Sequence, residues 1–143
     1  MNQLPAPLLE QLNAQFRDAR AKVESGDREG GIKTAEGAWE RLPEPKFDWD
    51  ATKIYVHSLA KLYRDCGKYD QALALMNDLF ASGTVQSYDA EPYFIEGTVY
   101  YEMGDLKNAQ KWLNEANKIS KGRCFQGKPP KYKQAIAKAA EPA

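Results

Sequence analysis

Residues 93–116, YFIEGTVYYEMGDLKNAQKWLNEA, decide the fold of this chain. Tyr100 stands four residues before Gly104, and apolar or small residues follow at helical spacing: Leu106, Ala109, Leu113 and Ala116. In such a pattern the aromatic residue ends a first helix, the glycine permits a tight reversal, and the alanines let a second helix lie close. The stretch therefore predicts a helix–turn–helix hairpin.

The same pattern occurs once earlier in the chain. Tyr63 precedes Gly67 by four residues, and the small or apolar positions that follow are Tyr69, Ala72, Met76 and Leu79. Gly67 and Gly104 are 37 residues apart, against a period of about 34 for the tetratricopeptide repeat, and the loop ASGTVQSYD accounts for the excess. The two copies resemble that repeat.

A weaker copy, aligned on Gly26, precedes these two. Ala35 and Ala38 take the places of Met76 and Leu79, and Pro43 stands at the terminal proline position of the repeat. This copy lacks the aromatic residues, as a terminal repeat can, because only one of its faces meets a neighbour. The sequence predicts an all-α fold: a short right-handed solenoid of three hairpins, at about residues 6–43, 47–81 and 88–120, with a capping helix in the segment 121–140 and a single domain over 1–143.

Apolar periodicity and helix-boundary residues predict seven helices. They run from about Ala6 or Pro7 to Glu24, from Asp27 as a cap to Leu42, from about Trp49 to Cys66, from Tyr69 to Ala81, from Glu91 or Pro92 to about Met103, from Leu106 to about Ile119, and from Pro129 or Pro130 onward. Asp48 or Asp50 is expected to cap the third helix. Trp112 lies beside the apolar face of the sixth helix and is expected to meet the capping helix and Phe125.

Composition excludes several classes of protein. Twenty basic and twenty acidic residues cancel, so no global field attracts nucleic acid or a membrane surface. No apolar run approaches the ~18 residues that span a bilayer, and the N-terminal MNQLPAPLLEQL lacks an export pattern. Two cysteines, Cys66 and Cys124, do not make a disulfide framework. We expect a cytoplasmic protein.

The sequence offers no group that predicts catalysis. His57 is the only histidine, and Ser58 beside it faces another side of the same helix. One histidine and two distant cysteines do not make a metal site. GDREGG lacks the lysine and Ser/Thr of a phosphate loop, so its glycines indicate a turn. We expect neither an enzyme nor a cofactor or metal.

The inner face of stacked hairpins is formed by the first helix of each pair, and it is the expected partner-binding surface. Phe94 and Tyr101 are expected to be exposed there as aromatic anchors within a polar rim. In the alternative interpretation, Phe16 and Phe94 fill the angle between neighbouring hairpins. The predicted binding residues are Asn13, Phe16, Arg20, Glu24, His57, Lys61, Arg64, Asp65, Glu91, Phe94, Thr98, Tyr101 and Glu102.

Two further segments narrow the prediction: LPEPK at 42–46 followed by Trp49, and GRCFQG at 122–127 followed by Lys131-Tyr132. With the hairpin residues, they resemble a family of small bacterial tetratricopeptide-type immunity proteins encoded beside polymorphic secreted toxins. The resemblance implies a cytosolic protein that neutralises one cognate toxin by direct binding. An adaptor or chaperone for assembly or secretion is the alternative. The basic run from Lys118 to Lys138 indicates a solvated helix face or a complement to an acidic partner.

Overall fold

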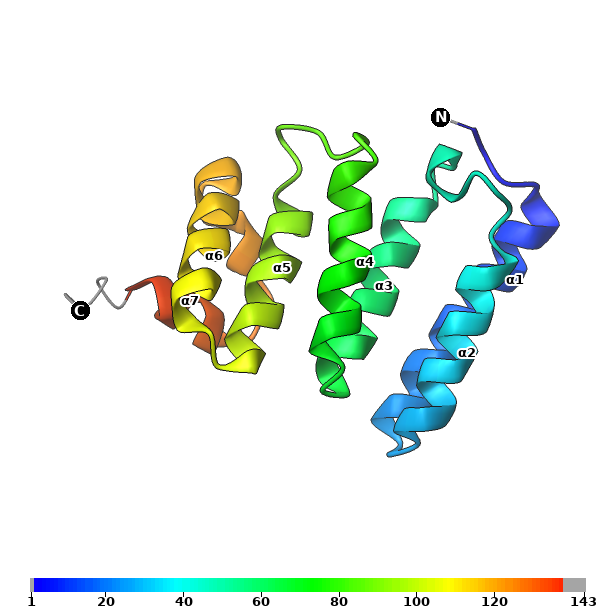
Figure 1. Ribbon diagram of the computed structural model, residues 1–143, viewed down its shortest axis with the longest axis horizontal. Coiled ribbons are helices and arrows are strands. Elements are labelled where there is room, and N and C mark those ends of the chain that lie inside the picture. The colour runs from blue at the N-terminus through cyan, green and yellow to red at the C-terminus, as the bar shows by residue number, and fades with distance from the viewer. Residues whose placement is uncertain (1, 138–143) are drawn as a thin grey trace. The chain divides into compact units, whose positions relative to one another are not determined.

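The computed structural model describes residues 2–137, and within them the fold is all-α (Figure 1). Its elements are α1 (Ala6–Glu24), α2 (Arg28–Arg41), the 3-10 turn η1 (Lys46–Asp48), α3 (Thr52–Asp65), α4 (Tyr69–Ala81), α5 (Ala90–Met103), α6 (Leu106–Ser120), the 3-10 turn η2 (Arg123–Phe125) and α7 (Pro130–Ala137). The predicted helical-repeat fold class is confirmed, and the predicted helix bounds agree with these closely except at α3. Residues 138–140 of the predicted capping segment lie outside the described residues.

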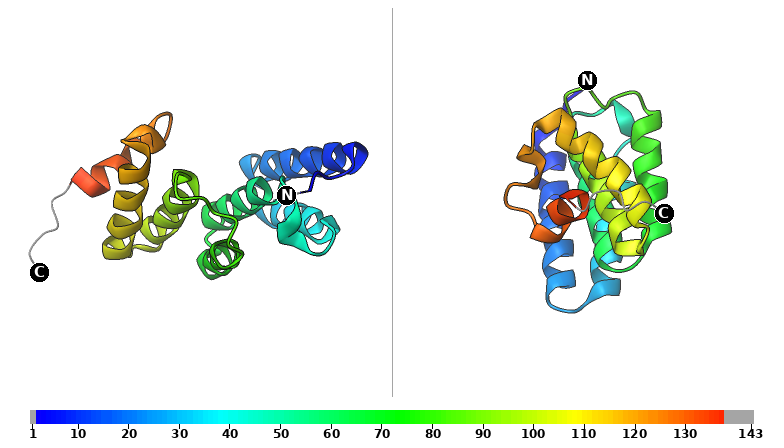
Figure 2. Two further views of the ribbon diagram at one scale, coloured as in Figure 1. Left: turned by 90° about the horizontal axis from the view of Figure 1, so that it is seen from above. Right: turned by 90° about the vertical axis from the view of Figure 1, so that its left-hand side faces the viewer.

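The chain divides into two compact units, which we call unit 1 (Met1–Thr84) and unit 2 (Val85–Ala143). Unit 1 holds the hairpins α1–α2 and α3–α4, and α1 also packs against α3. Figures 1 and 2 both show α1 beside α2. Unit 2 holds the hairpin α5–α6, with η2 and α7 against it. The description of the chain as one domain stays a prediction.

The glycines at the three predicted turns adopt left-handed backbone conformations. Gly26, Gly67 and Gly104 have φ of 100°, 76° and 87°. This region costs glycine nothing sterically, whereas a residue with a Cβ is strained there. Asp27 caps α2 as predicted, because its side chain accepts a hydrogen bond of 3.0 Å from the backbone N–H of Gly30. The hairpin pattern therefore located the reversals correctly.

The start of α3 differs from the prediction. The helix begins at Thr52, its N-cap residue is Ala51, and no side chain caps it. The backbone groups of Asp48 and Asp50 instead bond to Asn2, which forms an isolated β-bridge with Trp49. The Asn2 N–H donates to the Asp48 carbonyl (2.9 Å), and the Asp50 N–H donates to the Asn2 carbonyl (2.8 Å). The prediction that either aspartate caps the helix is wrong, because their backbone groups are used in this bridge and the helix starts later.

The segment LPEPK and the tryptophan after it form a hydrogen-bonded corner between α2 and α3. The Lys46 ammonium donates to the carbonyls of Trp39 and Leu42, both at 2.8 Å. It also lies 5.4 Å from the centroid of the Trp39 ring. The Trp49 indole N–H donates to the Pro43 carbonyl at 2.9 Å. These residues satisfy the carbonyls at the end of α2 and hold the turn that leads into α3.

Phe94 of α5 is the centre of the core of unit 2 rather than a surface residue. Its side chain is 2% exposed, and its ring centroid lies 5.7 Å from those of both Phe125 and Tyr132. The prediction that Phe94 is exposed is wrong because η2 and α7 fold over it. Trp112 has Tyr93 as a ring partner at 5.8 Å. Phe94 thus lies at the contact with η2 and α7, and the expected contact of Trp112 with the capping helix stays a prediction.

Ion pairs hold this cover on α5. We call residues 123–137 the C-terminal segment. Lys128 Nζ lies 3.3 Å from Glu91 Oε1, and Lys131 Nζ lies 2.8 Å from Glu102 Oε2. The Tyr132 hydroxyl also donates to Glu102, at 2.8 Å. Part of the basic C-terminal run is therefore used within unit 2.

Candidate functional site

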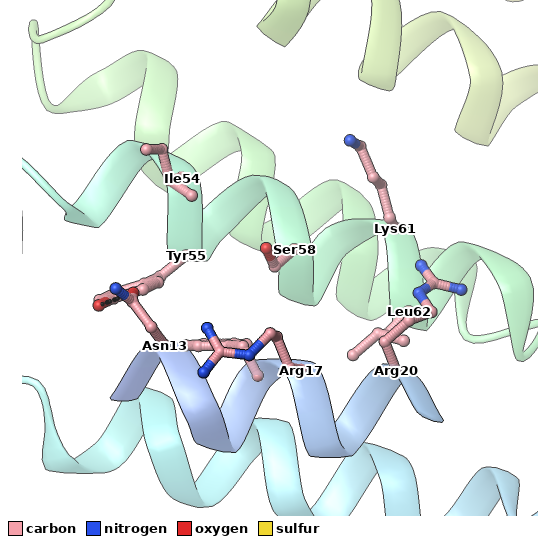
Figure 3. Close-up of a pocket in the computed structure, with 9 residues that line it drawn as sticks. Asn13, Arg17, Arg20, Ile54, Tyr55, Ser58, Lys61 and Leu62 are labelled. Carbon is pink, nitrogen blue, oxygen red and sulfur yellow. Dashed lines mark hydrogen bonds between the residues drawn. The ribbon is translucent and has the colours of Figure 1, made fainter. Parts of the chain in front are cut away.

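The groove between α1 and α3 in unit 1 is the candidate site (Figure 3). It has a volume of about 520 Å³, and both helices contribute side chains to it. We call it the α1–α3 groove. Its lining residues are Asn13, Phe16, Arg17, Arg20, Ile54, Tyr55, Ser58, Lys61 and Leu62. Four of the predicted binding residues lie here, namely Asn13, Phe16, Arg20 and Lys61.

The floor of the groove is a pair of stacked aromatic rings. Phe16 and Tyr55 lie with their centroids 4.8 Å apart and their planes at 16°. The Tyr55 hydroxyl donates a 2.6 Å hydrogen bond to Asn13 Oδ1. Both rings are buried, at 6% and 2% exposure, and burial raises the pKa of Tyr55. The stack joins the first helices of two hairpins, as the alternative interpretation of Phe16 predicted, and gives the groove a fixed floor.

Tyr55 was absent from the predicted site residues. Tyr55, Leu59 and Leu62 recur at helical spacing along α3 and form its buried stripe. That spacing marks Tyr55 as a core residue, which it is, and gives no sign that its ring also faces an opening. Ile54, the residue before Tyr55, is the stronger sequence signal of a binding surface. An isoleucine one position off the buried stripe is expected to face solvent.

The rim of the groove combines one apolar side chain with cations. Ile54 is 63% exposed. Figure 3 shows Ile54 and Lys61 projecting from α3 on the side away from α1, with Ser58 between them on the same helix. Arg17 and Arg20 reach the groove from α1. None of the nine lining residues is an aspartate or a glutamate, so the groove is basic in a chain with no net charge.

Arg20 is held at one end of the groove by Asp65. The guanidinium of Arg20 lies 2.8 Å from Asp65 Oδ2, and Arg64 Nε lies 2.9 Å from Asp65 Oδ1. Burial alone would raise the pKa of Asp65, but the hydrogen bonds and charges of Arg64 and Arg20 outweigh burial and lower it. Two cations thus share one carboxylate. The structure therefore brings together three of the predicted site residues, Arg20, Arg64 and Asp65.

The other predicted site residues lie elsewhere. Glu24 is exposed in the last turn of α1, and His57 is half-buried on α3; neither lines the groove. Five residues belong to α5 in unit 2, where Thr98 is buried and its hydroxyl donates to the Ile95 carbonyl at 2.7 Å. The remaining four contact the C-terminal segment, as described for Glu91, Phe94 and Glu102, and Tyr101 packs on Tyr132 with ring centroids 5.4 Å apart. Phe94 and Thr98 are inaccessible to a partner.

Two smaller openings lie elsewhere in the two units. One, of about 340 Å³ in unit 2, is lined by Tyr101, Gly104, Leu106, Lys131, Gln134 and Ala135. The other, of about 290 Å³ in unit 1, is lined by Glu29, Ile32, Lys33, Glu36, Lys68 and Gln71. The lysine of the first is paired with Glu102, and the second contains both signs of charge. The α1–α3 groove differs from both in its excess of cations and its exposed isoleucine.

Within residues 2–137, no three histidine, cysteine or carboxylate side chains come together as a metal site would need. Cys66 and Cys124 are both free thiols. No helix in this part of the chain has the length and apolar character to cross a bilayer. The open groove offers a nonpolar floor and cations, which is an arrangement suited to binding.

The hairpin of unit 2 is similar to a known family of repeats. A family model described as a tetratricopeptide repeat matches residues 90–122, which comprise α5, the Gly104 turn and α6. No curated protein and no solved structure matches the chain. Tetratricopeptide repeats are protein–protein interaction modules and are typically not catalytic. The chain therefore carries, in α5 and α6, a region similar to a repeat whose general role is to bind other proteins.

Proposed function

We propose that this chain is a protein-binding module and that the α1–α3 groove is the site of its partner. One observation carries the proposal: Ile54 is 63% exposed at the rim of a groove that Arg17 and Lys61 also line and whose floor is a pair of stacked rings. Apolar side chains surrounded by a charged rim are typical of protein interfaces, in which arginine is enriched. The groove replaces Phe94 as the centre of the expected interface, because Phe94 is inside unit 2.

The partner that we propose is a secreted toxin domain, which the chain neutralises by direct binding in the cytoplasm without a cofactor. The support for this finer role is the resemblance of residues 42–49 and 122–132 to bacterial immunity proteins. Both segments have internal roles, at the α2–α3 corner and over Phe94. They therefore characterise the scaffold, and the contact residues must come from another surface such as the groove.

Co-expression tests the role and the site together. The toxin domain to use is the one encoded beside this gene, expressed with the parent chain, with Ile54→Asp, or with Tyr88→Asp. Tyr88 is a matched control because it is an exposed apolar residue, at 76%, outside the groove. We expect the parent and Tyr88→Asp to bind the toxin domain and protect the cells, and Ile54→Asp to lose binding by more than about tenfold.

The outcomes separate the two parts of the proposal. Full protection by a folded Ile54→Asp variant, checked by circular dichroism, would place the interface outside the groove. A parent chain that neither binds nor protects would rule out immunity against that toxin. Capture of a non-toxin partner through the intact groove would then favour the adaptor role.

A further inference from the structure

We propose that the α1–α3 groove binds an acidic segment of a partner protein, in which carboxylates flank an apolar side chain. This inference rests on the groove being the partner site, as proposed above, and adds the chemistry of what enters it. Three features of the groove support it: its cations, the Ser58 hydroxyl and the exposed side chain of Ile54 on its rim.

The charge of the groove is local. Arg17, Arg20 and Lys61 line it and no carboxylate does, although the chain has 20 basic and 20 acidic residues. A cleft lined by one sign of charge raises the local concentration of the opposite charge and speeds its association. An acidic segment is therefore attracted to this groove and not to the molecule as a whole.

Arg17 is the cation that the fold does not use. Its side chain is exposed on α1, and it makes no hydrogen bond or ion pair with any residue in the described part of the chain. Asp18, beside it, is paired with Lys22 at 3.3 Å, and Asp65 is paired with Arg20. An incoming carboxylate meets Arg17 without first breaking an internal ion pair, and a guanidinium can bind it with two parallel hydrogen bonds.

The middle of the groove offers a polar donor next to apolar surface. Ser58 lines the groove from α3, and its hydroxyl makes no hydrogen bond within residues 2–137. Ile54 stands one turn before it on α3 and is exposed. A segment that alternates acidic and apolar side chains can therefore place a carboxylate at Ser58 and Arg17 and an apolar group against Ile54.

The aromatic floor favours a protein segment over a nucleic acid. Single-stranded nucleic acids bind where bases stack on exposed rings in a basic channel. Phe16 and Tyr55 are stacked on each other, and their exposures are only 6% and 2%. The rings are already occupied, so the groove offers phosphates some charge but offers bases no platform.

Fluorescence anisotropy with synthetic peptides tests the proposal. The probe is a labelled short peptide of alternating Glu and Leu, and its twin carries Gln in place of Glu. We expect the Glu peptide to bind the parent about tenfold more tightly than its twin, and added salt to reduce this difference. The variant Arg17→Glu with Lys61→Glu should remove the preference for Glu.

A matched control separates the groove from net charge. Arg28→Glu with Lys107→Glu changes the net charge by the same amount, and both positions lie in the first turns of helices, α2 and α6, where glutamate is favourable. This control should keep most of the preference. All variants are first shown to be folded by circular dichroism.

Three results would overturn the inference: equal binding of the two peptides by the parent, equal loss in the groove variant and the control, or tighter groove-dependent binding of a single-stranded RNA than of the Glu peptide. No toxin is present in this assay. A chain that prefers the Glu peptide but fails to protect cells therefore contradicts only the immunity role. Protection that depends on Ile54, without any preference for Glu, contradicts only the acidic-segment inference.

Discussion

Glu96 of α5 is a carboxylic acid that the fold keeps out of water. Its side chain is 1% exposed, and its Oε2 atom has no hydrogen-bond partner among the described residues. Burial raises the pKa of Glu96 from 4.5 to about 7, because the charged form is poorly solvated there. The sequence pattern places Glu96 beside Gly97 in a helix but does not show how completely both are enclosed.

We predict that Glu96→Gln removes a pH dependence of stability. In the unfolded chain the carboxyl ionises near pH 4.5, whereas in the folded chain it stays protonated up to about pH 7. The stability contributed by the protonated form is therefore present below about pH 4.5 and is lost as the pH rises to about 7. Urea unfolding should show the variant gaining up to about 3 kcal/mol on the parent between these limits.

The control for this prediction is Glu115→Gln on the exposed side of α6. That variant should follow the parent at every pH. If Glu96→Gln also follows the parent, the carboxyl of Glu96 is ionised in the folded chain, and the assignment of a raised pKa is wrong.

Gly97 provides the close approach between α5 and α6. A Cβ at this position would lie 2.7 Å from Leu113 Cγ and 3.0 Å from the Leu113 backbone nitrogen. Leu113 is fully buried and has little room to move. We predict that Gly97→Ala lowers the free energy of unfolding by about 1–3 kcal/mol, because overpacking outweighs the gain in helix propensity.

The matched variant is Gly37→Ala in α2, where a Cβ would meet only the tip of the Gln15 side chain at 3.1 Å. There the gain in helix propensity should leave stability unchanged or slightly higher. Thermal melts of the two variants make the comparison. Equal melting temperatures would mean that α5 and α6 are not as closely packed as the structure shows.

At the scale of elements, the hairpins could be predicted from sequence. The packing of the C-terminal segment over Phe94 and the start of α3 could not. Each hairpin has local signals, namely apolar residues at helical spacing and a turn glycine, and in the first hairpin Asp27 also caps α2. The burial of Phe94 depends on Phe125 and Tyr132, which belong to a later segment. The start of α3 likewise depends on Asn2, far away in the chain. Such distant contacts leave no trace in a local pattern.

We predict that Tyr132 is the residue that fixes the C-terminal segment. Its ring packs on both Phe94 and Tyr101, and its hydroxyl donates to Glu102. Tyr132→Ala should lower the free energy of unfolding by about 3–5 kcal/mol, as for other large aromatic side chains removed from a core. Chemical denaturation measures this loss.

Lys133→Ala provides the comparison, because Lys133 is the next residue on α7 and is exposed. It should change stability by less than about 0.5 kcal/mol. If the two variants unfold alike, the C-terminal segment is a free arm rather than part of the core of unit 2.

At the scale of the whole molecule, the division into two units has a direct test. The core of unit 1 contains residues from all four of its helices, including Leu12, Ile32, Leu59 and Met76, and all of them precede Val85. We predict that residues 1–84 alone form a helical protein that unfolds cooperatively. Circular dichroism during a thermal melt checks this. A featureless, gradual melt would show that unit 1 cannot fold by itself.

The covered position of Phe94 also matters while the chain is being made. The apolar face around Phe94 is complete once α5 and α6 have formed their hairpin, but it stays bare until Phe125 and Tyr132, which come later in the chain, fold onto it. Domains generally fold as units during synthesis, and bare apolar surface invites aggregation in the meantime. Unit 2 therefore depends on residues translated after its hairpin, and a stop codon that removes η2 and α7 should yield chains that associate with chaperones.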